Sequence, residues 1–242
     1  MKIKIYFHVP AIVGWEDFVD QKTNLMKRVG LWAAADSIKF LLHYPGSDFT
    51  WIYQKFSNDP KVLFWECQDS VRPLSEIYSQ RHIWECCQNE KDPVAIFRYH
   101  TKGLTYRYDE RLWELSQQWT NYLDYWNIEL WKTAYLILKH TDYESVGANW
   151  HPIWKTHLDI PGHWSGNIWW ANSEYIKKLP LLRKSHEINN DKQLGGFEAR
   201  HDSELWIGVA RPKILELHHF EAANVLTDGV LPPDPKIYRL PE

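Results

Sequence analysis

The chain has 242 residues and a formal net charge of −3, so it is long enough for one large domain and offers no electrostatic case for binding nucleic acid. Its three cysteines are odd in number, and Cys86 and Cys87 are adjacent, which argues against a disulfide framework and a zinc knuckle. No apolar run approaches the roughly 18 residues that span a bilayer, and the N-terminus lacks a signal-peptide pattern. We therefore expect a soluble, cytoplasmic protein without a transmembrane segment.

Strand and helix patterns alternate through the first hundred residues. Period-two runs predict strands over residues 2–10, 37–44, 61–67 and 93–99. Helical spacing and turn residues predict helices over 15–29, 49–56 and from Pro73 onward. This rhythm favours an α/β fold with a largely parallel sheet covered on both faces. Ligands of such sheets bind beyond the carboxyl ends of the strands, where His8, Glu66 and His100 fall.

The second half of the chain has a different pattern. An apolar stripe over 109–140 predicts a long helix or a helix pair, which we interpret as scaffold. Further along, the predicted elements are a strand over 144–150, a strand, turn and helix over 163–180, a loop entering a helix over 200–206, and a last strand over 212–218. Ser173 is the expected cap of the helix before Pro180. We expect one domain over 1–222 and an extended tail over 223–242.

The end of the fourth predicted strand carries His100, Thr101, Lys102 and Gly103. An imidazole, a hydroxyl, a cation and a permissive glycine suit a diphosphate, although an ordinary surface loop would also explain them. A Walker loop is excluded because the glycine spacing before the lysine is missing, and no GxGxxG follows a strand. A conventional ATP or dinucleotide site is therefore disfavoured.

A second candidate stretch begins with Ser165, Gly166 and Asn167 and continues into Trp169 and Trp170. Small polar residues let the backbone approach a ligand, and tryptophan rings stack on sugars; an ordinary buried strand and turn is the alternative. Adjacent strand residues face opposite ways, so the two tryptophans cannot both line one pocket. We expect one of them in the core and the small polar positions nearer to a sugar.

Two carboxylates, Asp202 and Glu204, lie at a predicted helix start. A helix cap explains Asp202 equally well, because side-chain oxygens satisfy the first amide groups of a helix. The functional interpretation is a general base, or an anchor, for a hydroxyl acceptor, and Glu204 is then the stronger candidate.

Four motifs carry a resemblance to a known family: YHTKGLT (99–105), VGANW (146–150), SGNIWWANSEYIKKLP (165–180) and SELWI (203–207). In their residues and in their order along the chain they resemble a group of GT-A (nucleotide-diphospho-sugar transferase) glycosyltransferases found in large algal viruses, phages and bacterial polysaccharide clusters. The resemblance implies a Rossmann-like mixed sheet flanked by helices, with a nucleotide-binding half (1–103) and an acceptor and donor-sugar half (104–222). It also implies transfer of a sugar from a UDP- or dTDP-linked donor to a hydroxyl of a glycan acceptor.

The resemblance also implies roles for particular residues. The nucleotide and its diphosphate would meet His8, Val9, Pro10, His100, Thr101, Lys102 and Gly103. The sugar and acceptor would meet Ser165, Gly166, Asn167, Trp169, Trp170, Gly195 and Gly196. Catalysis would fall to Glu204, with Asp202 beside it.

The chain departs from the family in one respect, because it contains no Asp-x-Asp to hold Mn²⁺ or Mg²⁺. Two alternatives stay open: Lys102 neutralises the diphosphate itself, or His100 and a distant carboxylate share a metal. Two other functions also stay open, a carbohydrate-binding protein without catalysis and a degenerate GT-A partner subunit.

Overall fold

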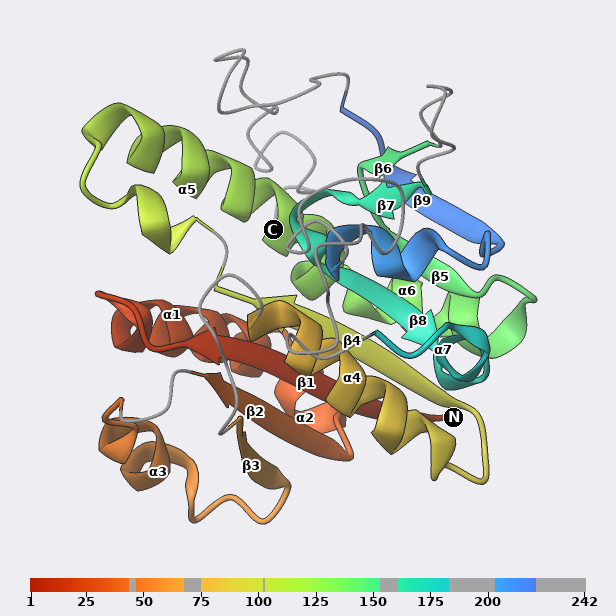
Figure 1. Cartoon of the computed structure of the whole chain (residues 1–242), viewed down its shortest axis with the longest axis horizontal. Helices are drawn as coiled ribbons and strands as arrows, with labels where there is room; N and C mark the ends of the chain where they lie inside the picture. Colours follow the sequence, from red (N-terminus) through yellow and green to blue (C-terminus); the bar gives the residue numbers. More distant parts are fainter. Residues whose placement is uncertain (44–46, 68–74, 102, 153–160, 183–202, 221–242) are drawn as a thin grey trace.

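The computed structural model describes residues 1–43, 47–67, 75–101, 103–152, 161–182 and 203–220. Within these ranges the chain forms a seven-stranded mixed sheet in the order β3-β2-β1-β4-β8-β5-β9 (Figure 1). The strands are β1 (Lys2–Pro10), β2 (Ser37–His43), β3 (Val62–Glu66), β4 (Val94–His100), β5 (Ser145–Ala148), β8 (Trp169–Asn172) and β9 (Ile214–His218). The predicted α/β class with a mostly parallel sheet is confirmed.

The first four strands are parallel to one another, and β8 then runs antiparallel to both β4 and β5. The strand predicted over 144–150 is interrupted at Asn149, which adopts a left-handed conformation with φ 59°. Beyond it, the short strands β6 (Trp150–His151) and β7 (His163–Trp164) pair with each other. The predicted tail over 223–242 lies outside the described residues.

Helices cover both faces of the sheet. One face packs against α1 (Trp15–Arg28), α2 (Leu31–Ala34), α3 (Thr50–Phe56), α5 (Glu110–Asp124) and α6 (Trp131–His140). The other face packs against α4 (Ser75–Gln88) and α7 (Ser173–Lys178) (Figure 1). The strands alternate accordingly: Phe7 of β1 belongs to the first core, and its neighbour Tyr6 belongs to the second.

Short turns connect several of these elements. Three are 3₁₀ turns, η2 (Leu104–Tyr106), η4 (Ser165–Asn167) and η6 (Trp206–Gly208). The helix or helix pair predicted over 109–140 is α5 and α6, joined by a π-helical turn, η3 (Tyr125–Glu129). The predicted N-terminal cap of α7 is wrong by one residue. Asn172 caps the helix by accepting from the Glu174 amide at 3.0 Å, whereas Ser173 Oγ accepts from the Val94 amide at 2.9 Å and ties α7 to β4.

A buried ion pair joins α1 to α5 beneath the sheet. Lys22 Nζ lies 2.7 Å from Asp124 Oδ2, and both side chains are almost fully buried. Tyr99 of β4 donates its hydroxyl to Asp124 Oδ1 at 2.6 Å. Burial and the neighbouring Asp124 raise the pKa of Tyr99 well above its usual value, so the phenol keeps the proton that it donates. Helices from the two halves of the sequence are thus held together by one charge network.

Within the described ranges, no helix combines the length and the apolar character that crossing a membrane requires.

Candidate functional site

The order of the parallel strands reverses next to β1. From β1 the chain adds β2 and β3 on one side, then returns to place β4 on the other. Ligands of open α/β sheets bind at such a switch point, beyond the carboxyl ends of the strands. His8 and His100 are register partners across this point, with ring centroids 6.3 Å apart. The two predicted strand-end histidines therefore meet where a binding site is expected.

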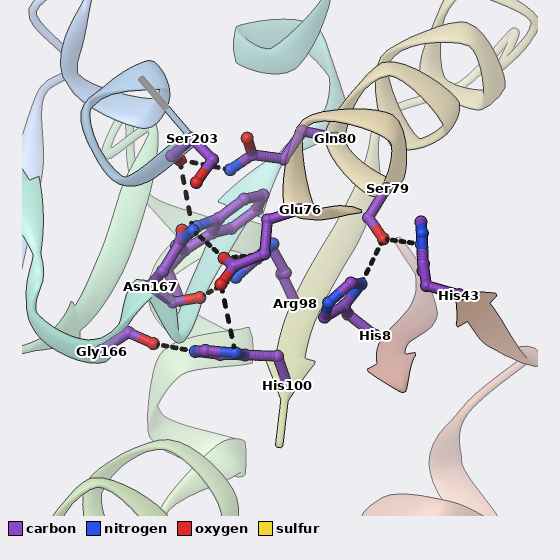
Figure 2. A network of polar contacts seen from close by, with 11 residues as sticks. His8, His43, Glu76, Ser79, Gln80, Arg98, His100, Gly166, Asn167 and Ser203 are labelled. Carbon is purple, nitrogen blue, oxygen red and sulfur yellow. Dashed lines mark hydrogen bonds and ion pairs between the residues drawn. The ribbon is translucent and has the colours of Figure 1, made fainter. Parts of the chain in front are cut away.

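A serine of α4 links two histidines from neighbouring strands (Figure 2). Ser79 Oγ lies 2.6 Å from His8 Nδ1 and 2.7 Å from His43 Nε2, and all three side chains are buried. A hydroxyl has one proton, so Ser79 donates to one imidazole and accepts an N–H from the other. His43 Nδ1 has no hydrogen-bond partner in the described part of the chain. The unit fits two neutral imidazoles of fixed orientation.

The pKa values of these histidines agree with that geometry. Burial is the largest cause in both cases: it lowers the pKa of His43 to about 3 and that of His8 well below its usual value. His43 and Arg98 lower the pKa of His8 further, whereas Glu76 opposes the shift at both rings. Both histidines are therefore uncharged at neutral pH.

Acidification from pH 6.5 to pH 5 is expected to lower the free energy of unfolding by about 1.6 kcal/mol through His43 alone. The folded pKa of about 3 lies below the unfolded value of 6.5, so the unfolded chain binds more protons throughout this window. Urea unfolding at pH 5.0, 5.5, 6.0 and 6.5 measures the slope. The control is His43→Gln, which keeps an amide near Ser79 but does not titrate. If wild type and variant show the same slope, His43 is not held neutral by the fold.

Glu76, on the first turn of α4, is the centre of a second set of contacts (Figure 2). Together with Arg98, His100 and Asn167 it forms the Glu76 cluster. Its Oε2 accepts from Arg98 Nη2 at 2.8 Å and from Asn167 Nδ2 at 2.8 Å, and its Oε1 lies 3.7 Å from His100 Nδ1. Arg98 is fully buried, and it also donates to the Asn167 carbonyl. Burial lowers the pKa of Arg98 and Glu76 opposes that shift, because each charge compensates the other.

The imidazole of His100 is held between two acceptors. Its Nε2 lies 2.5 Å from the Gly166 carbonyl, which can only accept, so this nitrogen carries a hydrogen. Its Nδ1 faces the Glu76 carboxylate. In this arrangement Nε2 offers no lone pair, so a metal could meet His100 only at Nδ1, on the side of Glu76; the role of His100 as a metal ligand stays a prediction. Across the described ranges, no three His, Cys, Asp or Glu side chains are grouped so as to hold a metal ion.

The turn that carries Ser165, Gly166 and Asn167 is where the structure corrects the predicted sugar site. Gly166 and Asn167 both have left-handed backbones, with φ 67° and 52°. Asn167 is buried: its amide donates to Glu76 and to the Ser203 carbonyl at 3.2 Å, and its oxygen accepts from Trp169 Nε1 at 3.0 Å. These bonds occupy the polar atoms of its side chain, so Asn167 holds the turn in place and does not present its amide to a ligand.

Ser165 is also buried and engaged with protein groups. Its hydroxyl lies 3.1 Å from Asn149 Nδ2 and 2.6 Å from His151 Nε2. The carbonyl of Gly166 is bonded to His100, as described above. The small polar residues of this turn therefore connect neighbouring segments, and the predicted contact with a sugar finds no available side-chain group on Ser165 or Asn167.

Trp169 and Trp170 are both core residues, which corrects their predicted role in sugar binding. Neither indole has exposed surface, and they lie on opposite faces of β8 in the two separate cores. Trp170 stacks on Phe97 with ring centroids 4.6 Å apart and donates to the Asn127 carbonyl at 2.9 Å. The argument from strand geometry correctly separates them, but the structure buries both.

The other predicted site residues have mixed outcomes. Val9 and Pro10 are buried at the end of β1, so their side chains offer nothing to a nucleotide base. Thr101 is buried, and its hydroxyl has no hydrogen-bond partner among the described residues. Gly103 has φ 88°, and a Cβ there would lie 1.7 Å from Ser116 Oγ, so only glycine fits this approach to α5.

Glu204 is half-buried, directly after Ser203, whose carbonyl accepts from Gln80 at 2.6 Å and from Asn167. Its charge opposes the lowering of the pKa values of Arg98 and His151, so it lies within electrostatic reach of the Glu76 cluster. Four predicted site residues lie outside the described residues: Lys102, Gly195, Gly196 and Asp202.

Sequence reasoning misses four residues of the site, His43, Glu76, Ser79 and Arg98. Arg98 carries the clearest signal, because a charge within a strand buried on both faces requires a partner. His43 ends its predicted strand as His8 does. Glu76 and Ser79 carry no comparable signal, since helical residues do not reveal which strand end they will face.

No protein-family model matches the chain, and no curated protein is significantly similar to it.

Proposed function

We propose that this protein is a GT-A glycosyltransferase that moves a sugar from a UDP- or dTDP-linked donor to a hydroxyl of a glycan. The observation that carries the proposal is that the four resemblance motifs, spread over more than a hundred residues, are bonded to one another. The connecting pairs are His100 with Gly166, Asn149 with Ser165, and Asn167 with Ser203. The motifs therefore form one spatial unit beside the switch point of the sheet.

The sheet supports the same proposal. The resemblance implies a Rossmann-like mixed sheet, and here four parallel strands are extended by the antiparallel β8. The paired histidines at the ends of β1 and β4 lie where a nucleotide donor binds in sheets of this kind.

The departing diphosphate gains negative charge during transfer, so the reaction needs cationic or hydrogen-bonding groups beside it. Arg98 is not that group, because it is buried and committed to Glu76 and Asn167. We assign this task to Lys102, because it belongs to the same resemblance motif as His100 at the end of β4. Glu204 takes the role of base or anchor for the acceptor hydroxyl.

The described residues do not fit the Mn²⁺ or Mg²⁺ of the family. Hard divalent cations prefer several carboxylate oxygens, and in the described ranges no three His, Cys, Asp or Glu side chains are grouped to hold one; Glu76 Oε2 already accepts from Arg98 and Asn167. A cytoplasmic location fits three cysteines that form no disulfide with one another.

A panel of UDP-, dTDP-, GDP- and ADP-sugars should reveal a donor by thermal shift. A ligand at about 100 times its Kd should stabilise the fold by about 2.7 kcal/mol. Lys102→Ala should weaken this effect, whereas Lys91→Ala, a change at an exposed lysine, should not. Each arm is run with and without manganese.

The proposal fails if no nucleotide or nucleotide sugar raises the melting temperature in either condition. Release of nucleoside diphosphate that depends on a glycan acceptor separates the transferase from its two alternatives. A carbohydrate-binding protein would bind the glycan without nucleotide, and a degenerate partner subunit would bind the donor without turnover.

A further inference from the structure

A cluster outside the candidate site joins a thiol, an imidazole and an ammonium group between α4 and β2. His82 and Cys86 are four residues apart on α4 and so share a face of the helix. Lys39 Nζ of β2 lies 3.0 Å from His82 Nε2 and 3.3 Å from Cys86 Sγ. The sulfur and the imidazole nitrogen are 3.5 Å apart, which closes a triangle of polar atoms.

The positive charge of Lys39 lacks a carboxylate partner in the described part of the chain. Its contacts there are His82, Cys86 and the ring of Tyr6, whose centroid is 5.7 Å from Nζ. A partly buried ammonium beside a sulfur atom favours the thiolate over the thiol, because the anion compensates its charge. Lys39 Nζ is placed in this way, 3.3 Å from the sulfur of Cys86.

His82 adds no charge to this cluster. Burial first, and Lys39 next, lower the pKa of His82 to about 4, so the ring is neutral at pH 7. Its Nε2 then accepts from Lys39. Trp65 stacks on the other side of the imidazole, with ring centroids 4.4 Å apart, and fixes its orientation. Lys39 is therefore the cation of the cluster and donates to both neighbours.

The three thiols of the chain differ in access. Cys67 and Cys87 are buried, and burial raises the pKa of Cys87. Cys86 is partly exposed, and its sulfur accepts from the Lys39 ammonium at 3.3 Å. Exposure and a neighbouring cation are the two conditions under which protein thiols react.

We propose that Cys86 is a selectively reactive thiol that a hydroperoxide oxidises to a sulfenic acid. The thiol proton passes to water, and the thiolate sulfur attacks one peroxide oxygen. A sulfur–oxygen bond forms as the oxygen–oxygen bond breaks, and the hydroxide that leaves combines with the released proton to give water. Sulfur loses two electrons and the peroxide gains them. The modified residue lies on the helix that carries Glu76 and Ser79.

The test treats the folded full chain with equimolar hydrogen peroxide and dimedone, which traps sulfenic acids, and quantifies each cysteine by peptide mass spectrometry. Dimedone should label Cys86 at least about ten times more than Cys67 or Cys87. Lys39→Met should slow labelling of Cys86 about tenfold, and Lys39→Arg should retain most of it. Lys4→Met, which removes the lysine paired with Glu90, is the matched control and should change little.

A second measurement on the wild type covers the case in which Lys39→Met fails to fold. The rates of Cys86 alkylation by anionic iodoacetate and by neutral iodoacetamide are compared with those of free cysteine. A cation beside the sulfur should raise the iodoacetate-to-iodoacetamide ratio at least about threefold. The inference is overturned if Cys86 is labelled no faster than the buried cysteines, if folded Lys39→Met reacts at the wild-type rate, or if the ratio equals that of free cysteine.

Discussion

Arg98→Met is expected to lower the free energy of unfolding by about 3 kcal/mol, the lower end of the range for breaking a buried ion pair. Methionine keeps most of the volume but leaves Glu76 without its cation and the Asn167 carbonyl without a donor. The estimate sits at the lower end because Glu76 keeps 27% of its side-chain surface exposed, so water screens part of the uncompensated charge. Urea unfolding at pH 7 measures the loss.

Two companion variants make the Arg98 result specific. Lys178→Met breaks an ion pair with Glu144 in which the lysine is 62% exposed, and it should cost less than about 1 kcal/mol. Adding Glu76→Gln to Arg98→Met should recover part of the loss, because it removes the uncompensated charge. If Arg98→Met unfolds at the same urea concentration as Lys178→Met, the Glu76 cluster does not stabilise this edge of the sheet.

Lys22→Met is expected to cost about 4 kcal/mol, because its partner Asp124 is almost fully buried. After the change, the carboxylate keeps the hydroxyl of Tyr99 at 2.6 Å but has lost the ammonium group. The loss should appear in urea unfolding at pH 7.

The double variant Lys22→Met with Asp124→Leu tests the cause of that loss. Removing both charges should restore much of the stability, since apolar replacement of a buried pair is often neutral. Lys213→Met is the surface control: its pair with Asp142 is 52% and 77% exposed, and the change should leave the unfolding curve nearly unchanged. An unrecovered double variant would mean that the lost hydrogen bond from Tyr99, or side-chain shape, outweighs charge at this position.

Local patterns predict the strands and helices of this protein well where their residues alternate cleanly. The run from Lys2 to Pro10 is a strand in both the prediction and the structure, because every second residue is apolar and belongs to one core, namely Ile3, Ile5, Phe7 and Val9. The helix caps are harder to predict. Asn172 and Ser173 are both good cap residues, but the Ser173 hydroxyl accepts from the Val94 amide of β4, and Asn172 caps the helix. Local sequence offers two equivalent caps, and packing selects one.

The candidate site likewise contains residues that local sequence predicts and residues that it does not. His8 and His100 are predictable, because any residue at the carboxyl end of a parallel strand lies at the ligand edge of the sheet. Glu76 is not, because its contacts with Arg98 and Asn167 join residues 22 and 91 positions away. Asn167 misleads for a related reason: a small polar residue in a turn suits a ligand and a buried hydrogen-bond network equally well.

The sequence by itself determines the α/β class, the near-complete set of strands and the histidines at the strand ends, because these follow from short-range periodicity and chain direction. Only the tertiary structure decides that Trp169 and Trp170 are both buried, that Asn167 supports the turn, and that Glu76 collects Arg98, Asn167 and His100. The physical reason is that burial and charge pairing depend on which distant segments meet. The same residue pattern can face solvent or the core, depending on which segment of the chain packs against it.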